Sequence, residues 1–100
     1  LTTRLPFIME EGLYHIAQEA LNNTLKHSHA KTVNVTLRQS GPVITLEIVD
    51  DGCGFDVANV SQEGKMGLTD MAEHATELGG MLTVTSEPGQ GTRIKVDVIL

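Results

Sequence analysis

The hydrophobic and polar positions change their period several times along the chain, and each change predicts a new element. Apolar residues from Glu10 to about Ser28 recur every three or four positions, which predicts a helix with one buried stripe. That stripe consists of Leu13, Ile16, Ala17, Ala20, Leu21 and Leu25. A second helix is predicted by Leu68, Met71, Ala72, Ala75 and Leu78. Its expected end is the glycine pair Gly79-Gly80.

Four other segments alternate apolar and polar residues, as half-buried strands do. They are Thr32 to Gln39, Val43 to Asp50, Met81 to Ser86 and Thr92 to Leu100. Turn residues at positions 40–42 and 87–91 join them into two antiparallel hairpins. This order predicts an α+β fold, a two-layer sandwich with helices on one face of the sheet. Because a crossover must join the hairpins, we expect a mixed, mostly antiparallel sheet.

The domain boundaries follow from the same pattern. Residues 1–9 contain Pro6 and show no period, so we expect a connector from something upstream, with the folded domain at residues 10–100. The segment Asp51 to Lys65 holds three glycines and little periodicity. A loop of that length in a small domain is usually a lid or a binding loop.

Composition and charge narrow the classes of partner. Seven Lys and Arg against thirteen Asp and Glu give a net charge of −6, which argues against binding to nucleic acid. No apolar run is long enough to cross a bilayer, so we expect no direct membrane contact by this domain. The single cysteine, Cys53, and the absence of a leader pattern fit a cytoplasmic protein. A small polyanion with a metal ion remains compatible with an acidic surface.

The first candidate motif is a polar stripe on the first predicted helix. Helical spacing brings Glu19, Asn23 and Lys26 to one side, with Asn22 and His27 beside them. An amide oxygen at the rim of a pocket could complete a Mg²⁺ shell made of water and phosphate oxygens. Taken alone, the stripe is more simply a solvated helix face.

The second motif is the end of the second strand. Asp50 shares its parity with the apolar residues of that strand, so its carboxylate should point to the buried face. A buried carboxylate needs donors, and the exocyclic amine of adenine is one. Gly52 and Gly54 would let the backbone approach a flat ring. The alternative is a turn with a capping aspartate, which the same residues fit equally well.

Two glycine-rich segments complete the set. Gly64, Lys65, Gly67 and Leu68 come just before the second helix as the apolar spacing predicts it, where free N–H groups suit phosphate oxygens. Gly89-Gln90-Gly91-Thr92 opens the last strand, with the Thr92 hydroxyl expected to point inward. A flexible loop and an ordinary hairpin turn are the simpler interpretations of each segment alone.

The four motifs in this order resemble the conserved boxes of the histidine kinase ATPase domain, whose fold is the Bergerat-type (GHKL) ATP-binding fold. The resemblance covers residues from about Glu11 to Leu100. That superfamily includes the gyrase B subunit, the MutL proteins and the large heat-shock ATPase chaperones. The segments 15–21 and 67–80 are similar to the branch of sensor kinases that pairs with regulators of the NarL and LuxR type.

The resemblance implies a role for each matching residue. Asn23 would coordinate Mg²⁺, Asp50 would bind the adenine amine, and Glu19 would polarise the reacting group or a metal-bound water. Around these three, the resemblance implies a phosphate-binding set and an adenine wall. The phosphates would be contacted by Lys26, His27 and the segment Gly64, Lys65, Gly67 and Leu68, and the wall would be completed by Gly52, Gly54 and Thr92.

The resemblance also implies an activity. The parent protein would be a two-component sensor histidine kinase that uses ATP and Mg²⁺ and that could be anchored to a membrane. Residues 1–9 would connect its upstream dimerisation and phosphoacceptor domain to this one. It would transfer the γ-phosphoryl group to a histidine on a separate dimerisation domain and so signal to a response regulator. Lacking that acceptor, the 100-residue chain is expected to bind ATP or ADP without phosphorylating itself. The alternatives are an anti-sigma-factor-type serine kinase and a nucleotide-binding module without transfer activity.

Two positions depart from the usual family pattern. Asp51 stands where many relatives have Asn, and His74 stands where Arg is common, which removes a cation from that position. The four histidines lack a metal-ligand spacing with Cys53, so we expect no zinc site.

Overall fold

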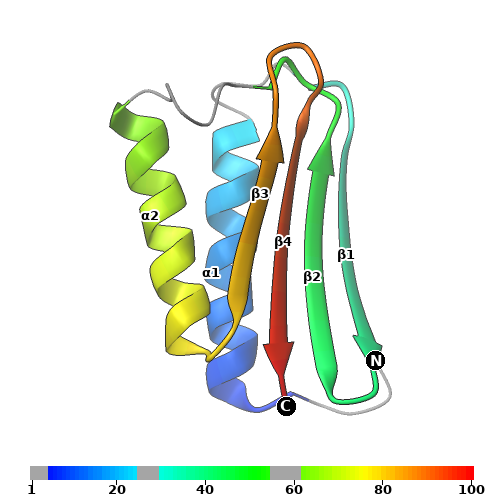
Figure 1. Cartoon of the computed structure of the whole chain (residues 1–100), viewed down its shortest axis with the longest axis vertical. Coiled ribbons are helices and arrows are strands. Elements are labelled where there is room, and N and C mark those ends of the chain that lie inside the picture. Colours follow the sequence, from blue (N-terminus) through cyan, green and yellow to red (C-terminus); the bar gives the residue numbers. More distant parts are fainter. Residues whose placement is uncertain (1–4, 25–29, 55–61) are drawn as a thin grey trace.

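The part of the protein that the structure describes is a two-layer sandwich of two helices against one four-stranded sheet (Figure 1). The structure, a computed structural model, describes residues 5–24, 30–54 and 62–100. Its elements in chain order are α1 (Phe7–Asn23), β1 (Val33–Ser40), β2 (Val43–Asp50), α2 (Gln62–Glu77), β3 (Met81–Ser86) and β4 (Thr92–Ile99). No helix in these ranges is both long and apolar enough to span a bilayer. The predicted α+β class with helices on one face is confirmed.

The sheet has the strand order β1-β2-β4-β3, and all three neighbouring pairs are antiparallel. The expectation of a mixed sheet is therefore wrong for the described strands. The reason is that β4 lies between β2 and β3. The crossover through α2 does join two parallel strands, as predicted, but they are not neighbours. Each of them pairs with β4 instead, in the opposite direction.

The first helix begins earlier than the apolar pattern predicts. Residues 7–9 belong to α1 and not to a connector, and the Pro6 carbonyl accepts hydrogen bonds from the N–H groups of Met9 and Glu10, both at 3.0 Å. Proline at a helix start loses no hydrogen bond, because the first N–H groups have no partner inside the helix. Leu5 and Met9 are buried, so they extend the apolar stripe toward the N-terminus.

The second helix also begins earlier than predicted, at Gln62, so residues 64–67 lie inside α2 and not in a loop before it. Glycine inside a helix costs about 1 kcal/mol relative to alanine. Tight packing against α1 gives one of these glycines its reason, as described below. The predicted end is confirmed: Gly79 has φ +71°, and the N–H of Gly80 donates to the Ala75 carbonyl at 2.8 Å.

The core fills the space between the helices and the inner face of the sheet. Its fully buried side chains come from both layers and include Ile16, Ile44, Ile48, Met71, Val96 and Val98. The prediction that residues 32–39 form a half-buried strand is only partly correct. Val35 and Leu37 face the helix side but remain 49% and 41% exposed. Because β1 is an edge strand, the helices leave it largely uncovered.

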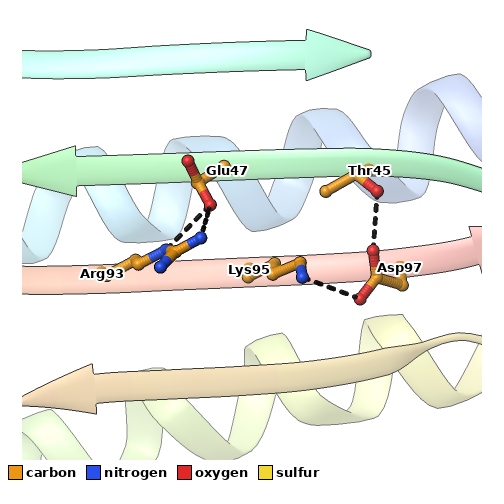
Figure 2. A network of polar contacts seen from close by, with 5 residues as sticks. All are labelled: Thr45, Glu47, Arg93, Lys95 and Asp97. Atoms are coloured by element: carbon orange, nitrogen blue, oxygen red, sulfur yellow. Dashed lines mark hydrogen bonds and ion pairs between the residues drawn. The ribbon is translucent and has the colours of Figure 1, made fainter. Parts of the chain in front are cut away.

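The outer face of the sheet is polar. Arg93 Nε donates to Glu47 Oε2 at 2.8 Å across β4 and β2, and Thr45 Oγ1 donates to Asp97 Oδ1 at 2.6 Å (Figure 2). Lys95 Nζ lies 3.7 Å from Asp97 Oδ2. The alternation therefore gives each strand one apolar face for the helices and one polar face of cross-strand pairs.

Candidate nucleotide-binding site

The C-terminal end of α1 meets the C-terminal end of β2. Thr24 Oγ1, directly after the helix, donates a hydrogen bond of 3.2 Å to Asp50 Oδ2, directly at the end of the strand. Both residues are only 7% exposed. This contact brings together the first two motifs, which are 26 residues apart in the sequence.

Asp50 lies on the buried face of the sheet, as its parity predicts. Its other oxygen, Oδ1, accepts the N–H of Gly52 at 2.8 Å. A carboxylate has about four acceptor positions, so two hydrogen bonds leave acceptor capacity for a ligand. The donors that make burial tolerable are a backbone amide and a hydroxyl. Thr24 was missed by sequence reasoning, although its hydroxyl adjoins Asn23.

Glu19 and Asn23 lie directly against α2 at Gly67. A Cβ atom added to Gly67 would stand 2.7 Å from Glu19 Oε1 and 2.9 Å from Asn23 Nδ2, closer than real Cβ atoms approach other atoms. A Cβ at this position would therefore force the ends of the Glu19 and Asn23 side chains to move. The first and third motifs are thus in contact, with an acid and an amide held at the seam between the helices.

The second and fourth motifs also pack against one another. Gly54 has φ +64°, and a Cβ there would lie 2.2 Å from a backbone oxygen of the turn before β4. Gly91 has φ +76°, and its Cβ would lie 2.3 Å from the backbone oxygen of Asp50. The N–H of Gly89 donates to the Cys53 carbonyl at 2.5 Å. These close backbone approaches hold the turn against the strand end that carries Asp50.

Thr92 points inward, as predicted, and is 9% exposed. It pairs with Asp50 on β2 and with Ser86 on β3. The hydroxyl oxygens of Ser86 and Thr92 are 2.9 Å apart, and Ser86 Oγ also donates to the Gly91 carbonyl at 3.0 Å. Ser86 was missed by sequence reasoning, although its parity with Val84 places it on the inner face.

Other predicted site residues stand apart from this cluster or outside the described ranges. Lys26 and His27 fall outside the described residues, and so does the side chain of Lys65. Gly64 is in the first turn of α2, whose N–H groups have no partner within the helix. Gly67 is one turn further in, so the expectation that it precedes the helix is wrong. Leu68 is partly buried and packs against the core.

Asp51 has a structural role at the start of β1. Its Oδ1 accepts the N–H groups of Lys31 at 2.8 Å and Thr32 at 2.9 Å, just before β1. The Thr32 N–H is the main cause that lowers the pKa of Asp51 below 3.8. An asparagine oxygen could accept the same two hydrogen bonds, which fits the interchange of the two residues at this position.

A pH dependence follows from Asp51. Because its pKa is lowered in the folded state, its contribution to stability is present above the unfolded pKa of about 3.9 and is lost as pH falls toward the folded value. We expect Asp51→Asn to remove this part of the acid destabilisation. Urea unfolding of both proteins between pH 3 and pH 6 measures it. Parallel curves of unfolding free energy against pH would contradict the assignment.

The two described histidines stack on one another between the helices. The rings of His15 and His74 have centroids 5.3 Å apart and planes 13° apart. Each lies near a carboxylate of its own helix, Glu11 at 4.0 Å and Glu77 at 3.8 Å. Within residues 5–24, 30–54 and 62–100, no three His, Cys, Asp or Glu side chains are grouped to hold a metal ion. The pair belongs to the packing of the seam.

A strand-end acid, a helix-borne amide and two glycine turns thus lie at one end of the sandwich, an arrangement that suits a nucleotide-binding protein. Residues 9–100 match the family model of the histidine kinase-, DNA gyrase B- and HSP90-like ATPases, and the chain belongs to this family. Membership implies that the chain uses a nucleotide.

Curated relatives narrow the comparison to sensor kinases. The chain is 40% identical over 90 residues to the sensor histidine kinase LiaS of Bacillus subtilis, covering 90% of the chain and 25% of LiaS. It is also 40% identical over 93 residues to the sensor protein VraS of Staphylococcus aureus, covering 93% of the chain and 26% of VraS. The chain thus spans about a quarter of the length of these relatives.

Solved structures agree on the fold. The histidine kinase domain of a blue-light activated histidine kinase from Erythrobacter litoralis matches 96% of the chain, and 46% of that structure, with a TM-score of 0.74 and 24% identity. The histidine kinase AdeS of Acinetobacter baumannii matches 89% of the chain, and 46% of that structure, with a TM-score of 0.74 and 14% identity. At these identities the likeness concerns the fold alone.

Proposed function

We propose that this chain is the ATP-binding catalytic domain of a two-component sensor histidine kinase. In that role it donates the γ-phosphoryl group of ATP to a histidine on a separate dimerisation domain, and the signal then passes to a response regulator. The observation that carries the proposal is the junction of α1 with β2 and α2. There the Asn23 amide and the Glu19 carboxylate of α1 lie beside Gly67 of α2, and Thr24, directly after α1, joins them to the Asp50 carboxylate of β2.

One side of this junction, at Asp50, suits the adenine of ATP, and the other side, at Asn23 and Glu19, suits its phosphates and their metal ion. Asp50 is buried and acceptor-only, which suits the adenine amine. Asn23 and Glu19 offer oxygen ligands at the seam, and hard cations such as Mg²⁺ prefer oxygen. When bound, Mg²⁺ would neutralise charge on the phosphates. Asn23 would hold the ion, and Glu19 would orient water or the reacting group.

Phosphoryl transfer asks mainly for positioning and electrostatic stabilisation. In this proposal Asp50 fixes the adenine ring of the nucleotide. Thr24 and Gly52 hold the Asp50 carboxylate in place through their hydrogen bonds. The phosphates reach the first turn of α2, whose free N–H groups carry the positive end of the helix dipole. We place the domain, which includes the whole of α1, in the cytoplasm, with the phosphoacceptor upstream in the parent protein.

Binding of nucleotide is tested by calorimetric titration of the chain with ADP and ATP, with and without Mg²⁺. We expect binding of both and tighter binding when Mg²⁺ is present. No detectable binding of either nucleotide, with or without Mg²⁺, would contradict the proposal.

The metal role is tested at Asn23. Asn23→Ala should weaken the dependence of ADP affinity on Mg²⁺ about tenfold, because one oxygen ligand and its orientation are lost. Magnesium titrations at fixed ADP measure the change. Asn22→Ala is the matched control, since Asn22 is the same residue type one position earlier and is exposed. An Asn23→Ala curve that overlays the Asn22→Ala curve argues against the metal role.

A further inference from the structure

A row of polar side chains crosses the inner face of the sheet at the end where β2 and β3 finish and β4 begins (Figure 1). The strand pairing places Asp50 opposite Thr92 and Thr92 opposite Ser86, so the row runs over β2, β4 and β3 at one level. Opposite residues on one face have Cβ atoms about 4.5–5.5 Å apart, close enough for direct contact of their side chains. Sequence reasoning assigned functions to the first two members and none to Ser86.

The direction of the hydrogen bonds in this row follows from counting protons. A hydroxyl has one proton to donate. A carbonyl oxygen can only accept, so Ser86 Oγ donates its one proton to the Gly91 carbonyl at 3.0 Å. The 2.9 Å contact between Ser86 and Thr92 then needs the proton of Thr92. Thr92 therefore presents lone pairs, and no proton, to any ligand beside it.

The neighbouring Asp50 carboxylate also offers a ligand only hydrogen-bond acceptors. Asp50 accepts from Thr24 and Gly52, and it can offer a ligand only further acceptor positions. The wall formed by Asp50 and Thr92 is thus acceptor-only. A ligand group that meets it must donate. The 6-amino group of adenine has two N–H donors, whereas the 6-oxo group of hypoxanthine or guanine only accepts.

We propose that Ser86 is a specificity-determining residue, which acts through Thr92 and makes the site favour 6-amino over 6-oxo purine nucleotides. This inference rests on the proposed function, because it places the purine beside Asp50 and Thr92. Ser86 itself need not touch the nucleotide. Because the Ser86 hydroxyl donates to the Gly91 carbonyl, it accepts the Thr92 proton and keeps that proton away from the ligand. A 6-oxo group would then meet two acceptors, Asp50 and Thr92, and no donor.

The test compares ADP with inosine diphosphate, which carries a 6-oxo group and a proton on N1. Affinities are measured by calorimetry for the full chain and for Ser86→Ala. Without the Ser86 oxygen, Thr92 can rotate and donate to the 6-oxo group. We expect the preference for ADP to fall about three- to tenfold, the usual effect of one hydrogen bond. Ser86→Thr keeps the hydroxyl and should keep the wild-type preference.

A second variant separates this mechanism from a general structural effect. In a Thr92→Val background no hydroxyl can rotate, so adding Ser86→Ala should leave the ratio of the two affinities unchanged. An equal loss of affinity for both nucleotides in Ser86→Ala would overturn the inference but leave the proposed function intact. Equal wild-type affinity for both nucleotides would also overturn it. Failure of the wild-type chain to bind either nucleotide would reject both proposals.

Discussion

Gly91→Ala is expected to lower the free energy of unfolding by about 3 kcal/mol. Two costs combine: a left-handed backbone costs a non-glycine residue about 1–2 kcal/mol, and an added methyl group in a tightly packed place costs about 1–3 kcal/mol. The added Cβ would meet the backbone oxygen of Asp50 at 2.3 Å. The strand end that carries the candidate adenine contact must then shift, so ADP binding should weaken as well.

Gly89→Ala is the matched control, because it lies in the same turn with φ +81° and has nothing within 4 Å of the added Cβ. It should incur only the backbone cost of about 1–2 kcal/mol and leave ADP affinity unchanged. Urea unfolding and ADP titration of both variants measure the difference. Equal destabilisation by the two substitutions would mean that the contact between the last turn and β2 is unimportant.

Asp50→Asn is expected to have the largest effect on nucleotide binding. It should weaken ADP by about 1.5–3 kcal/mol, roughly ten- to 150-fold, the usual range for a hydrogen bond to a charged group. The asparagine oxygen can still accept from Gly52, and its N–H can donate to Thr24, so the fold should persist. The asparagine N–H group is a donor, so it cannot accept a hydrogen bond from the adenine amine. Inorganic tripolyphosphate, which has no base, should bind with unchanged affinity.

The control for this prediction is Asp51→Asn, one residue further on, where the carboxylate accepts from the N–H groups of Lys31 and Thr32 before β1. That variant should bind ADP as the wild type does. Calorimetry with ADP and tripolyphosphate on both variants decides the matter. If Asp50→Asn weakened both ligands equally, Asp50 would not be the contact for the base.

Much of the fold could be predicted because the period-two alternation is strong. The bounds of β2 and β3 are as predicted, and the parity of Asp50 and Thr92 placed both on the buried face. The start of α2 could not be predicted, because glycines at positions 64 and 67 suggest a loop. Packing of Gly67 against Glu19 and Asn23 overrides that local preference, and no local pattern contains it.

Strand order was the other failure, for a similar reason. Pairing of β4 with β2 joins residues more than 40 positions apart, and alternation shows which face of a strand is buried but not which strand is its neighbour. The hydroxyl partners in the site were missed in the same way. Thr24 and Ser86 gain their importance only from residues that the fold brings beside them.

The central position of β4 has a consequence for the order in which the molecule can form. Synthesis delivers this strand last among the six elements, yet it is the partner of both β2 and β3. Until it leaves the ribosome, a nascent chain has an unpaired hairpin edge at β2 and no partner for β3. The helices have only part of a sheet to cover until then. Closure of the inner layer, and with it any capacity to hold a nucleotide, must therefore wait for the final strand.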